Sequence, residues 1–432
     1  MSGIGPDAAT AAAGGPEAAD RSVAPAEVAR VQRRTVWALS LGQVLGGLAF
    51  GATLSLGAVL AAELSGDEAF SGLAAAAVTL GTALTAVPLA RLARLRGRRL
   101  SLTVGMAIAL VGVVVVVAAV GAGSFPLLLG SFLLIGAGQA ANLQSRFAAA
   151  DLATDATRGR DLSIVVWATT VGAVLGPNLT GPGELVGDAV GMPPLTGPYL
   201  FTVVAQLIAI AVYLTTLRPD PLLLAQRVVA AAPKMAIAFV KPDSPVAARY
   251  AIFAIAAAHG TMVSVMAMTP VHLLHHGASL AIIGLTLSLH IAGMYALSPV
   301  FGIMSDRFGR VPTLLIGQVL LAAALLTASF GAESTAAVTV GLVLLGLGWS
   351  ASTVAGSTLL TEASSEERRT RRQGFSDFAM SLVGAGGAVL AGLVLGWLGY
   401  GGLALVVGVL VVSSLLLSPL GLRVAPRATP DP

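Results

Sequence analysis

The chain has no cysteine and few charged or aromatic residues. Because none of its 432 residues is a cysteine, it forms no disulfide and no thiolate metal site. Charged residues make up 11% and aromatic residues 5%, whereas 56% are hydrophobic, and the mean hydropathy is +0.87. This composition is far too apolar for a soluble domain of this length. We therefore expect the lipid bilayer to be its main solvent.

Patterns typical of enzymes are also missing. The sequence contains no phosphate-cradling loop, nucleophile triad or dinucleotide fingerprint, so we predict no enzyme and no cofactor. The sequence pI of about 9.8 needs no nucleic-acid partner, since basic loops beside anionic lipid heads explain it. The expected partners are the bilayer and a small-molecule or metal-ion substrate, and we expect a monomer.

Apolar stretches recur at the length of a membrane crossing. A hydrocarbon core roughly 30 Å thick needs about 20 apolar residues per helix. The pattern predicts an all-α membrane protein with twelve transmembrane helices, arranged as two pseudo-symmetric six-helix bundles. The predicted spans are 36–62, 69–90, 100–121, 125–150, 162–184, 197–217, 248–273, 280–304, 313–331, 335–360, 374–397 and 400–422.

Polar segments divide the chain. We predict a disordered cytoplasmic tail at 1–34, an N-terminal bundle at 35–217, a cytoplasmic linker at 218–247, a C-terminal bundle at 248–422 and a second cytoplasmic tail at 423–432. The linker contains an amphipathic stretch, residues 222–240, that we expect to lie along the membrane surface as a short helix.

Basic residues are confined to one side of this arrangement. All 25 lysines and arginines fall in the tails, the central linker and the loops after every second span, which the positive-inside rule assigns to the cytoplasm. The other side carries acids and imidazoles instead, including Glu333 and the loop histidines near 272–276. We therefore predict an inner-membrane protein with both termini cytoplasmic, and we interpret most of these arginines as solvated.

The loop after the eighth span carries a specific motif. It reads Gly302-Ile-Met-Ser-Asp306-Arg307-Phe-Gly309-Arg310, which resembles the GxxxDRxGR loop of the major facilitator superfamily. A carboxylate and two arginines beside a helix end can latch neighbouring helices, and the glycines permit a tight turn. The resemblance implies a carrier of two rocking halves. The corresponding loop of the first half has Arg94 in place of the Asp, so any charge latch there is different or absent.

The fifth span contains a glycine-proline motif. Gly172, Gly176, Pro177, Thr180 and Gly181 resemble the signature of drug/proton antiporters, which implies close helix packing and a hinge at the proline. Against this, Ser131 stands about where such antiporters have an intramembrane arginine. No Asp or Glu lies deep in any predicted span, although a proton-coupled exporter is expected to have one.

Histidine and methionine gather on the seventh and eighth spans. Met262 and Met266 share one helix face, as do His290 and Met294, because a spacing of four residues returns to the same side. Met262 and His290 lie at similar predicted depths, roughly 15 Å below the outer surface. Thioether and imidazole groups together favour Cu(I). We expect a copper site here, with His259 as a further candidate and with His272, His275 and His276 as a funnel for incoming ions.

The MxxxM and HxxxM pair resembles the motifs of the CcoA-type copper importers. The resemblance implies Cu(I) uptake by alternating access, with Met262, Met266, His290 and Met294 as the metal site and copper as cargo, although the membrane cysteines of those proteins are absent here. The alternatives are packing for the methionines and, for the protein, efflux of a drug or small metabolite or a receptor or assembly-factor role. Intramembrane amides could line a cavity for an organic substrate or join helices: Gln43, Gln139, Asn142, Gln144, Asn178, Gln206 and Gln318.

Overall fold

The computed structural model describes residues 24–67, 70, 72–231 and 243–423, and no strand occurs among them. Lipid offers the backbone no hydrogen-bond partner, and an α-helix satisfies the backbone within itself. The helices are α1 (Pro25–Ser65), α2 (Gly72–Arg96), α3 (Arg98–Gly121), α4 (Phe125–Ala148), α5 (Arg158–Asn178), α6 (Thr180–Ala189), α7 (Pro198–Thr216), α8 (Pro221–Ala231), α10 (Pro245–His275), α11 (Leu280–Tyr295), α12 (Ser298–Phe308), α13 (Arg310–Phe330), α14 (Thr335–Glu362), α15 (Glu366–Leu416) and a short 3₁₀ helix at Ser418–Leu420.

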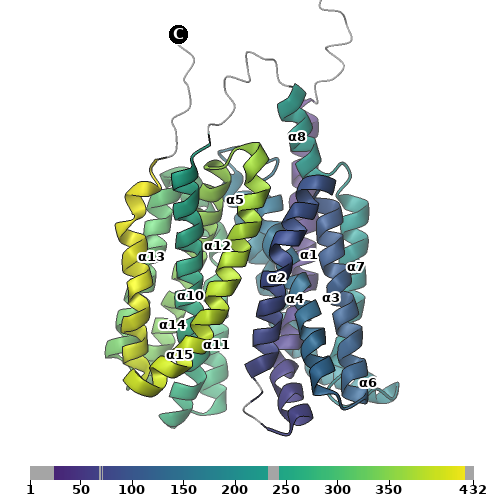
Figure 1. Cartoon of the computed structure of the whole chain (residues 1–432), viewed down its shortest axis with the longest axis vertical. Coiled ribbons are helices and arrows are strands. Elements are labelled where there is room, and N and C mark those ends of the chain that lie inside the picture. The colour runs from purple at the N-terminus through teal and green to yellow at the C-terminus, as the bar shows by residue number, and fades with distance from the viewer. Residues whose placement is uncertain (1–23, 68–69, 71, 232–242, 424–432) are drawn as a thin grey trace, which may run out of the picture.

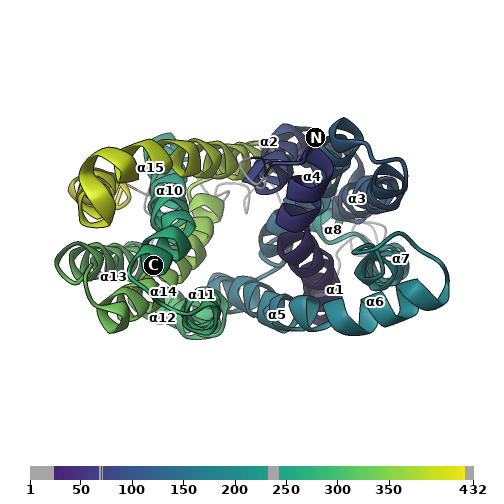
Figure 2. The same cartoon turned by 90° about the horizontal axis from the view of Figure 1, so that it is seen from below.

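The helices form two bundles that lie side by side (Figure 1). Helices α1–α7 make the N-half, and α10–α15 make the C-half. Figure 2 shows where they meet: α2 lies beside α15 at one edge of the boundary, and α5 lies beside α11 and α12 at the other. Each half has its own apolar core, and a smaller apolar cluster that includes Leu162 and Phe301 joins α5 to α12 across the boundary.

In each half, a glycine makes the sharp turn between two helices at the same end of the molecule. Gly97 separates α2 from α3 with φ 88°, and Gly309 separates α12 from α13 with φ 99°, a left-handed region that a side chain rarely adopts. Both turns lie at the top of Figure 1, together with α8, and we call this end of the molecule the basic end. The opposite end, with the α10–α11 turn, is called the histidine end.

The N-terminal tail is shorter than predicted. Residues 25–34 belong to α1 instead of a disordered segment, while residues 1–23 lie outside the described part of the chain. Packing explains the difference, because Gln32 Nε2 donates to the Ala149 carbonyl (2.7 Å) and to Asp161 Oδ2 (2.8 Å). Those bonds hold the first turns of α1 against the connection between α4 and α5.

The linker helix differs from the expected surface helix. Figure 1 shows α8 projecting from the basic end, and residues 232–242 lie outside the described part. Asp220 sets its direction: Oδ1 accepts from the amides of Leu222 (3.0 Å) and Leu223 (3.2 Å), while Oδ2 accepts from the Arg99 amide (2.7 Å). One carboxylate thus caps both α8 and α3.

Several predicted spans are interrupted. The fifth is divided into α5 and α6 around Leu179, the eighth into α11 and α12 at residues 296–297, and the last two are joined as α15 with a turn at Gly399 (φ 68°). Among the described residues, nine helical stretches are long and apolar enough to cross a bilayer. The chain is thus a multi-pass helical protein, and the count of twelve crossings stays a prediction.

Candidate functional site

A buried ion pair joins the two halves near the basic end. Arg146 Nη2, on α4, donates to Asp377 Oδ1, on α15, at 2.5 Å, and the two side chains are 3% and 0% exposed. Charges this deeply buried are costly unless they are paired. Asp377 Oδ2 and Arg146 Nε nevertheless have no hydrogen-bond partner among the described residues. The pair is therefore only partly satisfied.

Sequence reasoning missed this pair. The expectation that no acid lies deep in a span is wrong for Asp377, and Arg146 is not solvated. Asp377 falls near the start of the predicted span 374–397, but α15 begins earlier, at Glu366, which places Asp377 about three turns inside the helix. The signal available in the sequence was an Arg and an Asp inside predicted spans of different halves.

A second buried pair lies within the N-half. Arg98 donates from Nε to Asp151 Oδ2 (2.8 Å) and from Nη2 to Asp151 Oδ1 (3.2 Å), a two-pronged geometry that fits a guanidinium to a carboxylate. Nη2 also donates to Gln373 Oε1 of α15 at 2.7 Å. The first-half loop lacks the Asp of the motif, and the sequence did not indicate which contact replaces it. In the structure, Arg98 joins this loop to the C-half through the amide of Gln373.

The GxxxDRxGR loop forms the latch on the other edge of the boundary. Asp306 accepts from the amides of Gly159 and Arg160, each at 2.9 Å, and so caps the N-terminus of α5 in the opposite half. Gly302 makes the close approach possible, since a Cβ there would overlap with Ser163 Oγ. The Asp306 bonds join α12 to α5, and Arg307 is exposed outside this network.

Further ion pairs support the same latch. Glu362 Oε1, at the end of α14, contacts Arg310 Nη2 (2.9 Å) and Arg158 Nη1 (3.4 Å), while Arg310 also donates to the Asp155 carbonyl (2.7 Å). The solvated interpretation is wrong for the four arginines that are buried, all near the boundary between the halves: Arg98, Arg146, Arg158 and Arg369.

An aromatic cluster from the C-half faces this region. Trp349 Nε1 donates to His259 Nδ1 at 3.1 Å, and the Tyr295 ring meets Trp349 edge to face at 5.7 Å between centroids. Arg146 interacts electrostatically with both His259 and Tyr295. Gly384 makes room for the histidine, since a Cβ there would lie 2.7 Å from its ring. We call Arg146, His259, Tyr295 and Trp349 the central cluster.

The predicted copper residues lie mostly inside the C-half. Met262 and Met294 are buried in one apolar cluster, and Met266 packs against it. His290 is fully buried and turns toward α14, where its Nδ1 lies 2.8 Å from the Leu342 carbonyl. Its Nε2 has no hydrogen-bond partner among the described residues. His259 accepts a hydrogen bond from Trp349, whereas His290 contacts the Leu342 carbonyl, so the two histidines have different partners.

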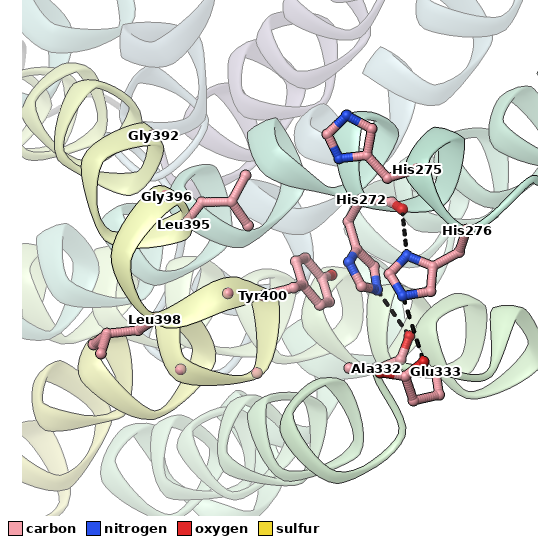
Figure 3. Close-up of a pocket in the computed structure, with 13 residues that line it drawn as sticks. His272, His275, His276, Ala332, Glu333, Gly392, Leu395, Gly396, Leu398 and Tyr400 are labelled. Atoms are coloured by element: carbon pink, nitrogen blue, oxygen red, sulfur yellow. Dashed lines mark hydrogen bonds and ion pairs between the residues drawn. The ribbon is translucent and has the colours of Figure 1, made fainter.

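The three loop histidines do gather, at the histidine end. They line a cavity of about 560 Å³ with Glu333 and Tyr400 (Figure 3). His272 stacks on Tyr400 with ring centroids 4.2 Å apart, and its Nε2 lies 2.8 Å from the Ala332 carbonyl. His276 Nε2 lies 3.5 Å from Glu333 Oε2, whereas Figure 3 shows His275 pointing away. Their predicted role as a funnel stays a prediction.

Of the glycines in the fifth-span motif, Gly172 lies in a close helix contact. Gly172 is buried against α1, where a Cβ would lie 2.8 Å from Gly47 Cα. Gly176 is buried as well, and Gly181 is exposed on α6. The helix breaks just after Pro177, between α5 and α6. The hinge function of the break stays a prediction.

Most of the intramembrane amide side chains contact residues of their own half. Asn142 and Gln206 line a cavity of about 10 Å³ among α1, α3, α4 and α7, which is close to the size of one water molecule. Gln144 donates to the Ala86 carbonyl (3.2 Å) and Gln318 to Ser352 Oγ (3.1 Å). Contacts of this kind join helices within a bundle.

The fold, with two helical bundles side by side and two latches at one end, is that of a membrane transporter built from two halves. The sequence model of the Major Facilitator Superfamily matches residues 39–289 and 251–432, and the chain belongs to this family. Two uncharacterized MFS-type transporters of Bacillus subtilis are similar to it: YdeG, 35% identical, covering 91% of this chain and 93% of the relative, and YddS, 36% identical, covering 91% and 92%.

More distant proteins share the fold over most of the chain. The riboflavin transporter RfnT of Brucella anthropi is 28% identical over 92% of this chain and 98% of its own length. The structure of the human organic anion transporter MFSD10 matches with a TM-score of 0.74 at 17% identity, covering 90% of this chain and 99% of that one. The proton:xylose symporter XylE matches with 0.66 at 16% identity, covering 93% and 97%. These two structures bear on the fold alone.

Proposed function

We propose that the chain moves a planar, polar organic molecule across the membrane, bound at the central cluster between its halves. Residues 35–217 rock against residues 248–422, so that the site opens to each side in turn. The carrying observation is that Arg146, from the N-half, acts electrostatically on His259 and Tyr295 of the C-half, and that Trp349 contacts both of these side chains. Each half thus contributes one part of the site.

The chemistry of the central cluster suits such a solute. Aromatic side chains bind flat ring systems by stacking or edge contact, and a guanidinium binds carbonyl, imide or anionic groups at the rim of the ring. The relative RfnT is named a riboflavin transporter, and riboflavin is a solute of this class. The match to RfnT covers 92% of this chain. Riboflavin is therefore the first probe to use.

We propose the following orientation. The basic end faces the cytoplasm, and the membrane is the inner membrane, because the latch loops, α8 and the arginines of the described residues lie toward that end. The protein acts as a monomer and has no catalytic role.

Binding of riboflavin to the purified protein tests the proposal. We expect Trp349→Ala to weaken binding at least tenfold, since the ring contact is lost, while Tyr295→Phe retains most of it because only the hydroxyl is removed. Trp397→Ala is the matched control, as this tryptophan is 79% exposed on the outside of α15. Equal binding by the Trp349→Ala and Trp397→Ala proteins, with uptake unchanged in both, would place the solute elsewhere.

Uptake of Cu(I) is the second candidate function. The buried His290 Nε2 without a hydrogen-bond partner favours it, because a backbone carbonyl at Nδ1 leaves Nε2 with a free lone pair, as in many metal-ligating histidines. Met294 lies one turn further along α11, and Met262 shares its apolar cluster. A soft cation would take these neutral ligands.

Copper content separates the two functions. The Met266→Leu, His290→Leu double variant should lose copper accumulation in cells if copper is the cargo, and Trp349→Ala should leave it unchanged. If the double variant accumulates copper like the unmodified protein, copper is not transported through this set. If the organic solute is the cargo, Trp349→Ala should weaken riboflavin binding, and the Met266→Leu, His290→Leu double variant should leave it unchanged.

A further inference from the structure

His259 bonds to Trp349 through one of its two ring nitrogens. The indole Nε1 of Trp349 donates to His259 Nδ1 at 3.1 Å. An indole N–H can only donate, so Nδ1 is the acceptor and carries no proton. A neutral imidazole has one N–H, which must then be at Nε2. The bond to Trp349 therefore fixes the His259 ring as the Nε2–H tautomer.

The N–H at Nε2 is left for another partner. The bond with Trp349 is the one hydrogen bond that the His259 ring makes to the described residues, and the side chain is partly exposed. A donor in an apolar region costs free energy until it meets an acceptor. The free N–H therefore favours a bound molecule that supplies an acceptor atom.

The free edge of the ring lies at the boundary between the halves. A Cβ at Gly384 would lie 2.7 Å from His259 Cδ2 and 2.9 Å from Nε2, so this edge is beside α15. Gly384 follows Asp377 by seven residues, about two turns on the same helix face, and Asp377 contacts Arg146 of the N-half. Arg146 also acts electrostatically on His259. Nε2 is thus placed where a solute between the halves can reach it.

The neighbouring polar groups of the central cluster are donors as well. Trp349 has a single N–H, and His259 accepts it, so the indole offers a solute only its ring. Arg146 has donors and no acceptor. A solute with carbonyl oxygens or unprotonated nitrogens along its edge matches these side chains. A solute whose edge carries only donors finds no acceptor on the three of them.

We propose that His259 determines the specificity of the central cluster by donating its Nε2–H to an acceptor atom on the edge of the transported solute. The same side chain holds Trp349 through Nδ1. The solutes of this site are therefore planar molecules with a carbonyl oxygen or an unprotonated ring nitrogen at that edge. This inference rests on the function proposed above and adds to it the solute atoms that are recognised.

Two substitutions of His259 separate its two contacts. The asparagine carbonyl oxygen reaches the place of Nδ1, so His259→Asn keeps the acceptor for Trp349 and loses the distal donor. The glutamine amide reaches the place of Nε2, so His259→Gln keeps the donor and loses the acceptor. Riboflavin binding should weaken by about tenfold in His259→Asn and by at most about threefold in His259→Gln, as expected for loss of one hydrogen bond to the solute. His275→Asn, at an exposed histidine, is the matched control.

The tautomer is measured separately, without solute. Solid-state NMR of the protein with ¹⁵N-labelled histidine in lipid bilayers should show the Nε2–H form for one of the five rings, and this signal should be missing from His259→Asn. An Nδ1–H form of His259 overturns the inference. So does riboflavin binding that is unchanged in His259→Asn, or weaker in His259→Gln than in His259→Asn, since His259 would then only position Trp349. If the unmodified protein binds no riboflavin, the proposed function fails, and the tautomer measurement still tests the inference.

Discussion

The two buried Arg–Asp pairs use the same chemistry in different places. Arg98 and Asp151 belong to one half and form a two-pronged contact, at 2.8 and 3.2 Å. Arg146 and Asp377 belong to different halves and share one short contact, with Asp377 Oδ2 left over. A pair inside a rigid body can be fully satisfied, since it never opens. If the halves separate as proposed, a pair across the boundary between them must open, and a partly satisfied pair costs less to open.

The same contrast separates the two latches. On the α5–α12 edge, Asp306 caps a helix of the other half and is surrounded by ion pairs. On the α2–α15 edge, the contact from Arg98 reaches the amide of Gln373 instead of an acid. The halves are thus joined by ion pairs and a helix cap at one edge, and by an arginine-to-amide hydrogen bond and the Arg146–Asp377 pair at the other.

The largest loss of stability is expected from breaking the Arg98–Asp151 pair inside the N-half. Asp151→Ala leaves Arg98 buried without its carboxylate inside the N-half, and we expect a loss of stability of about 3–5 kcal/mol. Asp377→Ala should cost less, because separation of the halves lets water reach Arg146. Thermal unfolding in detergent compares the two. A larger drop in Tm for Asp377→Ala would contradict the distinction between the pairs.

The next effect concerns the close crossing of α5 and α12. Gly302→Ala places a methyl group against Ser163 Oγ and the Gly159 carbonyl, so the closed arrangement loses about 1–3 kcal/mol by overpacking. Spin labels at Arg33→Cys, on α1, and Arg371→Cys, on α15, which are exposed at the basic end of the two halves, should then report a larger share of long distances between the halves. Gly130→Ala is the control, since a Cβ there meets nothing within 4 Å. Similar distances in both variants would mean that the crossing is not tight during function.

The two latches can be compared by equally small changes. Asp306→Asn weakens the cap on α5 and the contact with Arg310, which we expect to cost the closed arrangement about 1–2 kcal/mol. Gln373→Leu removes a single hydrogen bond, donated by the charged Arg98 to an uncharged amide, whereas Asp306 accepts two backbone bonds and also pairs with Arg310. The same spin-label distances should therefore shift more for Asp306→Asn. The reverse order would assign the stronger latch to the α2–α15 edge.

The smallest effect lies at the end of the linker. Asp243 accepts from the Ser365 amide (3.0 Å), and it pairs with Arg368 and Arg372. Burial alone raises the pKa of Asp243, but the bonds from Arg372, Ser365 and Arg368 outweigh it, and the pKa lies below its ordinary value. The stabilisation is complete above the unfolded pKa of about 3.9 and is lost as pH falls through the lowered one.

Hydrogen exchange checks this prediction at neutral pH. Asp243→Asn should speed exchange at the start of α15, in the segment 365–372, while exchange at the α5–α12 crossing stays unchanged. Equal exchange in both proteins would show that Asp243 does not hold the linker against α15.

Length, hydropathy and one loop motif sufficed to predict the fold. Apolar runs of bilayer length define helices whatever their neighbours are, and the Gly302–Arg310 motif indicated the superfamily, to which the chain belongs. Glycine positions were informative too, because Gly309 and Gly172 act through the local backbone and through close helix contacts.

The site could not be predicted to the same extent. Arg146 and Asp377 are 231 residues apart, and each lies near the end of a span, where a charge usually reaches water. Only the packing of α4 against α15 decides that they are buried together. The same holds for His259, whose contact with Trp349 depends on α14 and could not be read from its spacing to Met262. The copper set stays a hypothesis for this reason.

A charge exchange tests most directly whether Arg146 and Asp377 hold the halves together. Arg146→Asp and Asp377→Arg are made singly and together in the protein labelled at positions 33 and 371, and the label distances are measured at pH 8. We predict long distances in each single variant and a return of the short distance in the double variant, where the pair is restored in reverse. Short distances in both single variants, or a double variant as open as they are, would contradict the account.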